Sequence, residues 1–442
     1  MSTLTFKQGI HPEYNKELSK DQPLRKAKRP EMVIIPLQQH IGAPCKPLVK
    51  KGEHVDYGQK IGEADSFVSA PVHASVSGTV SEIKNVLGPT GQQSRAVVIK
   101  ADEKDELAEG IESRGSFEEL SPEEIKKIVK EAGIVGMGGA MFPTHVKLSV
   151  PEEKNIDYFV LNGAECEPYL TIDHRMMLER SEDIVFGMKA LMKTIGVSRG
   201  LIGIEENKPD AIESMEEIVK EEEGIEIRVL DTKYPQGGEK MLIKALLERV
   251  VPSGGLPLDV GVVVNNISTA AAVADAIKKG VPLVERGLTV TGQGVKEPGN
   301  FICRIGTPIG ELIEEAGGFT GEPGKIILGG PMTGFTQPGT EIPAVKGTSG
   351  VVVMNRDEVE HKEALPCIKC ARCVDSCPQF LMPVKLSQFA AHEMYEELEE
   401  FQVLNCIECG SCSYIWPANR PLMQYIKIGK AEITAKKRSS EG

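Results

Sequence analysis

Cysteine residues carry the clearest chemistry in this sequence. Seven of its ten cysteines fall in two runs near the C-terminus. The first run has the pattern CxxCxxCxxxCP, in which three thiolates hold one [4Fe–4S] cluster and the fourth reaches a second cluster. The second run repeats CxxCxxC, but Trp416, the only tryptophan, stands where its fourth cysteine is expected. The predicted iron ligands are Cys367, Cys370, Cys373, Cys377, Cys406, Cys409 and Cys412.

This crossed ligation predicts one complete and one incomplete cluster site. Cys377 completes the set formed by the second run, whereas the first three cysteines lack a fourth sulfur. The incomplete site can hold a three-iron cluster, recruit water or another side chain, or stay empty, and the spacing leaves these outcomes open. A zinc site is the alternative for the whole array, but zinc takes about four ligands, which does not account for seven thiols. We therefore predict iron–sulfur chemistry, altered or disabled at one site by Trp416.

Composition limits the classes of function. A length of 442 residues favours three or four domains, and a net charge of −13 argues against nucleic-acid binding. Cysteines kept as metal ligands indicate a reducing compartment. No stretch of about 18 apolar residues is present, and residues 1–18 lack the apolar core of a signal peptide. We expect a cytoplasmic chain without a transmembrane segment of its own.

The first hundred residues divide into an arm and a β-rich unit. Residues 1–30 are polar and contain a basic group, Arg25, Lys26, Lys28 and Arg29, which we interpret as a solvated linker; contact with anionic lipid or an acidic partner is the alternative. Residues 31–101 show short β runs separated by glycine. VKKGEHVDYGQKIGE and APVHASVSGTV resemble the barrel-sandwich hybrid of lipoyl and biotinyl carriers.

The carrier hairpin corresponds to residues 73–76, which contain no lysine for modification. We therefore expect a scaffold role for the hybrid unit. Its histidines, His40, His54 and His73, have no partners at ligand spacing, which predicts structural roles for them.

A glycine-rich turn follows the first predicted helix. Ser121, Pro122 and Glu124 form a helix start with an N-cap, proline at the first position and glutamate at the third. The turn GIVGMGGAMFP then leads at Pro143 into a second predicted helix, whose free N–H groups would favour phosphate. The turn alone is weak evidence, because glycines also form ordinary tight turns.

Three strand–loop–helix units strengthen the nucleotide hypothesis. The first strand lies in 157–168, the second begins near residue 225, and the third includes residues 262–266. Each is followed by glycine, asparagine or glutamate, the residues that open α/β sheets present at the carboxyl ends of their strands. The pattern predicts a doubly wound sheet with a nucleotide at that edge.

The motifs GMGGAMFPTHVK, NGAECEP, YPQGGEK and VVVNNIST together resemble the FMN- and NADH-binding subunit of respiratory complex I. With the hybrid unit and the two-cluster region, nearly the whole chain resembles the RnfC family, the peripheral subunits of the Rnf ferredoxin:NAD⁺ oxidoreductase. The resemblance implies a multidomain α/β and α+β chain. Its expected parts are an N-terminal arm (1–30), a barrel-sandwich hybrid (31–101), a Rossmann-like FMN/NADH domain (116–278), a β-grasp domain (279–354) and a helical two-cluster ferredoxin domain with its tail (355–442).

The resemblance also implies which residues bind the cofactors. The residues placed against the flavin or its phosphate are Gly136, Gly138, Gly139, Lys147, Asn162, Asn265 and Asn266. Glu165 and Glu167 would line the pocket as carboxylates. The residues assigned to the dinucleotide are Phe142, which would stack on the adenine, Gly237 and Glu239. The sequence departs from the complex I subunit at Met137, Ala164 and Gly238.

These cofactors imply the expected function. NADH gives up two electrons together, clusters accept them singly, and a flavin handles both steps, so no catalytic acid or nucleophile is expected. The family implies a subunit on the cytoplasmic face of the membrane, in a complex that translocates Na⁺ or H⁺ and uses ferredoxin. A soluble NADH dehydrogenase feeding a reductase is one alternative, and a scaffold or electron-wire subunit that does not oxidise NADH is another.

Overall fold

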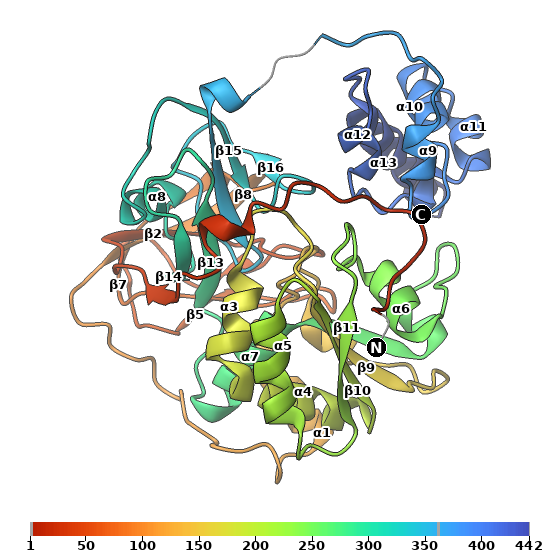
Figure 1. The fold of residues 1–442 in the computed structure, drawn as a ribbon. Coiled ribbons are helices and arrows are strands. Elements are labelled where there is room, and N and C mark those ends of the chain that lie inside the picture. The colour runs from red at the N-terminus through yellow and green to blue at the C-terminus, as the bar shows by residue number, and fades with distance from the viewer. Residues whose placement is uncertain (1–2, 360–362, 442) are drawn as a thin grey trace.

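The chain folds into four structural units, traced in a computed structural model that describes residues 3–359 and 363–441 (Figure 1). Two small antiparallel sheets form the hybrid unit, a parallel sheet with helices follows, a mixed sheet comes next, and a helical unit ends the chain. No helix in the described part is long and apolar enough to cross a membrane.

The hybrid domain consists of a four-stranded and a three-stranded sheet, as the sequence predicts. The first has the order β2-β8-β7-β4 and the second β3-β5-β6. Its core side chains include Val33, Ile35 and Ile61, all fully buried. The strands are β2 (Met32–Pro36), β3 (Lys46–Pro47), β4 (His54–Val55), β5 (Lys60–Glu63), β6 (Val72–His73), β7 (Gly78–Leu87) and β8 (Gln93–Ala101).

The second domain has a parallel sheet of four strands in the order β11-β10-β9-β12. The strands are β9 (Tyr158–Gly163), β10 (Gly200–Glu205), β11 (Ile225–Leu230) and β12 (Val262–Asn266). The sequence predicts three of them but not β10, whose residues are all buried. A run buried on both faces of a parallel sheet lacks the alternation that marks a half-exposed strand.

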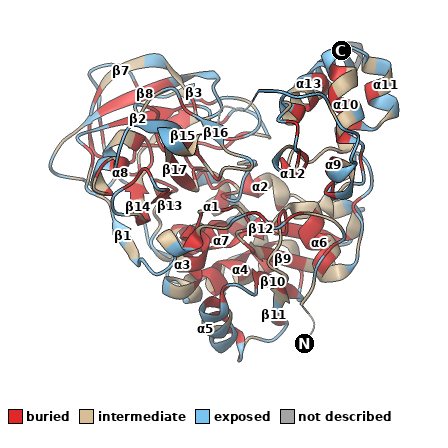
Figure 2. Cartoon of the chain, turned by 45° about the horizontal axis from the view of Figure 1, so that its top comes forward, coloured by how far each residue is buried: buried red, intermediate tan, exposed pale blue. Residues whose placement is uncertain are grey.

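Helices pack on this sheet and supply many of the buried residues of the domain (Figure 2). The capping box predicted at Ser121 is present at the start of α1. Gly187 of α4 lets α7 approach closely, because a Cβ there would lie 1.9 Å from the Ala270 carbonyl oxygen. The helices are α1 (Pro122–Glu131), α2 (Thr144–Lys147), α3 (Ile172–Glu179), α4 (Ser181–Ile195), α5 (Pro209–Val219), α6 (Glu239–Leu247) and α7 (Ile267–Lys278).

A mixed sheet with one helix forms the third unit. Its order is β1-β14-β13-β17-β15-β16, and α8 (Ile309–Glu315) packs on it near the predicted helix start at Pro308. The strands are β1 (Leu24–Lys26), β13 (Glu285–Thr291), β14 (Gly299–Arg304), β15 (Pro323–Leu328), β16 (Phe335–Thr336) and β17 (Gly350–Asn355). β1 comes from the N-terminal arm, so this sheet extends beyond the predicted 279–354 segment.

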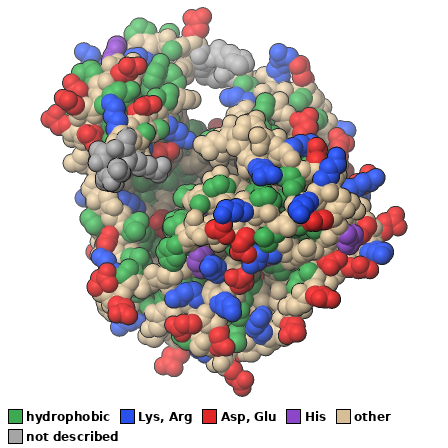
Figure 3. All heavy atoms as spheres, turned by 180° about the vertical axis from the view of Figure 1, so that it is seen from behind, with side chains coloured by type: hydrophobic (Ala, Val, Ile, Leu, Met, Phe, Trp, Pro, Cys, Tyr) green, Lys and Arg blue, Asp and Glu red, His purple; other side chains and the backbone are tan. Residues whose placement is uncertain are grey.

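The expectation that the arm is a solvated linker is wrong. β1 pairs in parallel with β14, and the Arg25 guanidinium lies 4.6 Å from the centre of the Phe301 ring. Arg29 forms ion pairs with Asp102 and Asp105 at 3.6 and 3.1 Å. Part of the basic group is therefore used inside the chain. On the face seen in Figure 3, acidic and basic side chains are intermingled.

The C-terminal unit is helical and internally repeated. Its helices are α9 (Arg372–Asp375), α10 (Pro383–Ala391), α11 (Tyr395–Glu400), α12 (Ser411–Tyr414) and α13 (Leu422–Glu441). Lys369 and Glu408 adopt the same positive φ of 56°. Their amides donate to Cys367 Sγ and Cys406 Sγ, in both cases at 3.4 Å.

Four short 3₁₀ turns, Lys16–Leu18, Pro257–Val260, Arg356–Glu358 and Val403–Asn405, complete the described elements.

A buried lysine joins the first three units. Lys346 is 1% exposed, and its ammonium donates to the carbonyls of Pro71 and Gly133 at 2.7 and 2.6 Å. Burial lowers the pKa of Lys346 from 10.5 to about 7, against an opposing effect of Cys45. The junction therefore disfavours the charged form of this group.

We predict that Lys346 makes stability depend on pH. Between its folded and unfolded pKa values of about 7 and 10.5 the unfolded chain binds more protons, so stability is gained as pH rises and lost as pH falls toward 7. The gain should reach about 1.4 kcal/mol per pH unit at most. Urea midpoints at several pH values should rise more steeply for the native chain than for Lys346→Met. Parallel profiles would contradict this prediction.

Candidate functional site

A cavity of about 580 Å³ opens at the carboxyl ends of β9 and β12. This is the edge at which doubly wound sheets bind nucleotides. Ten of the twelve residues predicted to bind cofactors line it. They are Gly136, Gly138, Gly139, Phe142, Lys147, Asn162, Gly237, Glu239, Asn265 and Asn266.

The glycine-rich loop forms one side of this cavity. The Gly136 amide donates to the Phe142 carbonyl at 2.9 Å and closes the loop. Gly139 has a φ of +146°, and a Cβ on Gly138 would come within 3.1 Å of Asn266. The helix expected from Pro143 is only α2, four residues long. The backbone of the glycine-rich loop therefore shapes this wall, because α2 is too short to contribute a long helix.

The side chains of the three asparagines in the cavity differ in their hydrogen bonding. The Asn266 side-chain amide donates to the Asp173 carboxylate at 2.7 Å, and its side-chain oxygen accepts from the backbone N–H of Ser268 and so caps α7. The Asn162 side-chain amide donates to the Gly237 carbonyl at 2.8 Å. Asn265 is 3% exposed, and neither polar atom of its side chain has a hydrogen-bond partner among the described residues. A buried amide left unpaired costs about 1–3 kcal/mol, so Asn265 fits a site that a polar ligand completes.

Two charged side chains face each other across the same wall. Lys147 Nζ lies 2.8 Å from Glu239 Oε1 and donates to the Val264 carbonyl at 2.9 Å. Both side chains keep a substantial exposed fraction, 26% and 39%. The pair joins α2 to the start of α6 and leaves charged groups available to a ligand.

The structure places Glu165 and Glu167 outside the cavity, contrary to the expectation that they line it. Glu165 accepts hydrogen bonds from the amides of Asp173 and His174 at the start of α3, at 2.6 and 3.2 Å. Glu167 accepts from the Met332 and Thr333 amides at 3.1 and 2.9 Å. Burial raises the pKa of both carboxyls. They fix backbone segments around the site.

Two buried lysines hold the loop that follows β9, and neither is predicted from the sequence. Lys208 Nζ donates to the Ala164 carbonyl at 2.7 Å and pairs with buried Glu205 at 3.2 Å. Lys16 Nζ donates to the carbonyls of Glu165 and Leu170 at 2.8 and 2.6 Å. Lysine is rarely buried, and neither position lies in a motif, so no local pattern marked them.

The same loop carries Cys166 between the cavity and the cysteine-rich unit. The Gly237 amide donates to Cys166 Sγ at 3.2 Å. Cys166, Tyr234 and Ile10 form a buried apolar cluster, against which Cys409 packs. The Tyr234 hydroxyl donates to the Cys409 carbonyl at 2.7 Å. Cys409 is thus separated from the cavity by Cys166 and the Gly237 turn.

One of the two cysteine sets that crossed ligation predicts lies around a common cavity. Cys377, Cys406, Cys409 and Cys412 line one small cavity, a donor set that fits a [4Fe–4S] cluster. In the described ranges, no three His, Cys, Asp or Glu side chains are grouped to hold a single metal ion.

Trp416 occupies the position in the second repeat that Cys377 has in the first. It is 7% exposed and forms an apolar cluster with Cys373 and Cys412, against which Cys367 packs. Cys370 of the same three-thiol set is exposed. The indole therefore lies beside Cys367 and Cys373, two members of this three-thiol set.

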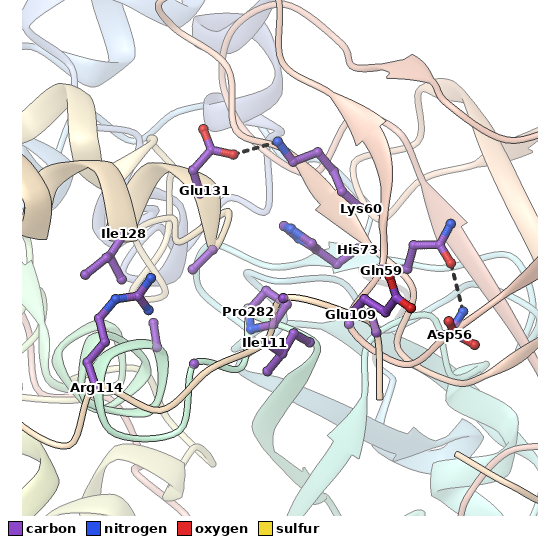
Figure 4. A pocket seen from close by; sticks show the side chains of 16 residues that line it. Asp56, Gln59, Lys60, His73, Glu109, Ile111, Arg114, Ile128, Glu131 and Pro282 are labelled. Atoms are coloured by element: carbon purple, nitrogen blue, oxygen red, sulfur yellow. Dashed lines mark hydrogen bonds and ion pairs between the residues drawn. The ribbon is translucent and has the colours of Figure 1, made fainter. Parts of the chain in front are cut away.

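A second cavity of about 600 Å³ lies between the hybrid domain and α1 (Figure 4). Its lining combines opposite charges, including the Lys60–Glu131 ion pair at 2.6 Å, with the buried His73 ring. None of the residues predicted to bind cofactors lines it. The flavin prediction therefore concerns only the cavity at the sheet edge.

Comparison with known families gives four matches in chain order. Residues 4–104 match the RnfC barrel sandwich hybrid domain, and residues 129–275 match the Nuo51 FMN-binding domain. Residues 288–336 match the SLBB domain, and residues 360–417 match the 4Fe–4S dicluster domain.

Full-length relatives and one solved structure agree with these matches. The corresponding subunit of the Na⁺-translocating ferredoxin:NAD⁺ oxidoreductase complex of Acetobacterium woodii is 49% identical over 98% of both chains. Its counterpart in the proton-translocating complex of Clostridium ljungdahlii is 48% identical over 98% of this chain and 94% of the relative. An NAD⁺-reducing [NiFe]-hydrogenase in the H₂-reduced state shares the fold, with a TM-score of 0.50 and 20% identity over 73% of this chain and 67% of that one. The chain therefore belongs to the RnfC family, one of the subunit families of ion-translocating ferredoxin:NAD⁺ oxidoreductase complexes.

Proposed function

We propose that this chain exchanges electrons between NAD(H) and ferredoxin within a membrane-associated, ion-translocating Rnf complex, using FMN in the sheet-edge cavity and iron–sulfur clusters in the C-terminal unit. One observation carries the proposal: the cavity that contains the unpartnered Asn265 is joined through Gly237 and Cys166 to Cys409 of the complete four-thiol set. FMN, when bound, supplies the conversion between paired and single electrons.

The residues of the cavity bind and orient. Asn265 would donate to and accept from the ring edge of the flavin, and the glycine-rich loop would let its backbone approach closely. Lys147 would face the phosphate or the ring edge, and Glu239 the ribose or nicotinamide end of the dinucleotide. Phe142 would lie against the adenine. No residue is required to transfer a proton for hydride exchange itself.

The complete four-thiol set would receive electrons before the other cysteines. Its Cys409 packs against the apolar group that borders the flavin cavity, and the Tyr234 hydroxyl fixes the Cys409 backbone. The names of the two relatives give Na⁺ as the translocated ion in one case and the proton in the other. We propose peripheral attachment to the membrane through the other subunits of the complex.

The test of this function uses the purified full chain loaded with FMN, iron and sulfide under anaerobic conditions. NADH should bleach the flavin absorbance and then reduce a cluster. In Cys409→Ser the flavin should still bleach, while cluster reduction is lost. A native chain that binds no flavin, or whose flavin is unchanged by NADH, would contradict the proposal and favour an electron-wire or scaffold role.

We predict that the Asn265 side chain contributes to FMN binding and does not stabilise the FMN-free protein. Asn265→Leu should leave the thermal midpoint of the FMN-free chain unchanged or higher, because it removes a buried, unpaired amide. FMN affinity, measured by fluorescence quenching, should fall about 10–100-fold. The exposed Asn85→Leu is the matched control. Destabilisation of the FMN-free Asn265→Leu chain without loss of affinity would assign the side chain a structural role.

We predict that Trp416 limits the cluster content of the chain. Trp416→Cys supplies the fourth sulfur for the set of Cys367, Cys370 and Cys373, so iron per chain should rise and a second [4Fe–4S] signal should appear in EPR spectra after reduction. Trp416→Phe, which adds no ligand, should match the native chain. Equal iron content and identical spectra in all three proteins would refute the prediction.

A further inference from the structure

The hybrid domain reaches into the cavity of the flavin domain. Ile41 lies between β2 and β3, and Phe67 between β5 and β6, yet both side chains line the sheet-edge cavity. They are 51% and 63% exposed, among the most exposed large apolar residues of the described chain. Apolar side chains left open at the wall of a cavity are typical of ligand contacts.

Both loops are anchored to the flavin domain through backbone groups. The Ile41 amide donates to the Met141 carbonyl at 3.3 Å, on the glycine-rich side of the cavity. His145 Nε2 donates to the Phe67 carbonyl at 3.1 Å, and the His145 ring lies edge-on to the Phe67 ring at 6.1 Å. Burial lowers the pKa of His145, which keeps the ring neutral. The two side chains are therefore placed without the help of a ligand.

The two loops also brace each other. The Ala43 amide donates to the Val68 carbonyl at 3.0 Å, and the Ala70 amide donates to His40 Nε2 at 3.1 Å. Gly42 has a φ of +117°, and a Cβ there would lie 2.0 Å from the Val68 carbonyl oxygen. The wall made by Ile41 and Phe67 is thus part of a fixed β-loop structure, which favours a preformed binding surface.

The chemistry of the cavity differs from wall to wall. Asn265, Lys147 and Glu239 supply polar groups, whereas Ile41 and Phe67 supply an apolar surface. A planar heteroaromatic ring satisfies both, because its faces are apolar and its edges form hydrogen bonds. We infer that Ile41 and Phe67 bind a ring of the nicotinamide adenine dinucleotide, so that the hybrid domain completes the dinucleotide site. This inference rests on the proposed function.

The experiment compares variants of the FMN-loaded full chain by anaerobic titration with NADH. Phe67→Ala should raise the NADH concentration for half-bleaching of the flavin roughly tenfold, the size of one lost aromatic stack. Phe67→Tyr keeps the ring and should match the native chain. Ile41→Glu, which replaces an apolar contact with a charged one, should also weaken NADH binding. Leu48→Ala, at a similarly exposed residue of the same domain outside this cavity, is the control.

Three further measurements make the outcome decisive. FMN affinity, reduction of the flavin by dithionite and the thermal midpoint should be unchanged in Phe67→Ala. Equal NADH titrations for Phe67→Ala, Ile41→Glu and the native chain would overturn this inference and leave the proposed function standing. A parallel loss of FMN and NADH binding would also overturn it, because the wall would then support the flavin. A native chain that binds no flavin would instead remove the proposed function.

Discussion

The loop that follows β9 depends on two buried ammonium groups. Its carbonyls at Ala164, Glu165 and Leu170 are turned toward Lys208 and Lys16, which donate to them from opposite parts of the sequence. Irregular backbone inside a protein must find partners, because an unpaired buried carbonyl costs free energy. Glu205 and Glu165 offset the two positive charges at 3.2 and 3.9 Å. The two buried ion pairs thus fix the course of the backbone in this loop.

This one loop touches each part of the proposed electron route. It begins beside Asn162 in the cavity, places Cys166 against Gly237 and Cys409, and uses Glu167 to hold the Met332–Thr333 amides. A Cβ on Gly410, next to Cys409, would lie 2.8 Å from the Met332 carbonyl oxygen. The short segment that begins at the flavin cavity therefore also contacts the cysteine-rich unit, directly through Cys166 and indirectly through Met332.

The sequence predicted those features that depend on residues close together along the chain. Cysteine spacing predicted four thiols that line one cavity, the capping box located α1, and the glycine and asparagine motifs predicted residues that line the sheet-edge cavity. Strand β10 was missed because burial on both faces removes its periodicity. Pattern could not show that Glu165 and Glu167 turn away from the cavity, or that Ile41 and Phe67 reach it. Such contacts depend on partners in other domains, such as His145 for Phe67, which no single segment encodes.

The N-terminal arm connects the beginning of the chain to parts that are synthesised much later. Leu4 forms an isolated β-bridge with Leu230, and the Gly9 amide donates to the Ser376 carbonyl at 3.3 Å. Strand β1 pairs with β14, which is made much later. During translation the domains can fold in order as they leave the ribosome, but the arm has no complete binding surface until the cysteine-rich unit is made. Docking of the arm therefore depends on segments far along the sequence, and it is completed only after the cysteine-rich unit has been made.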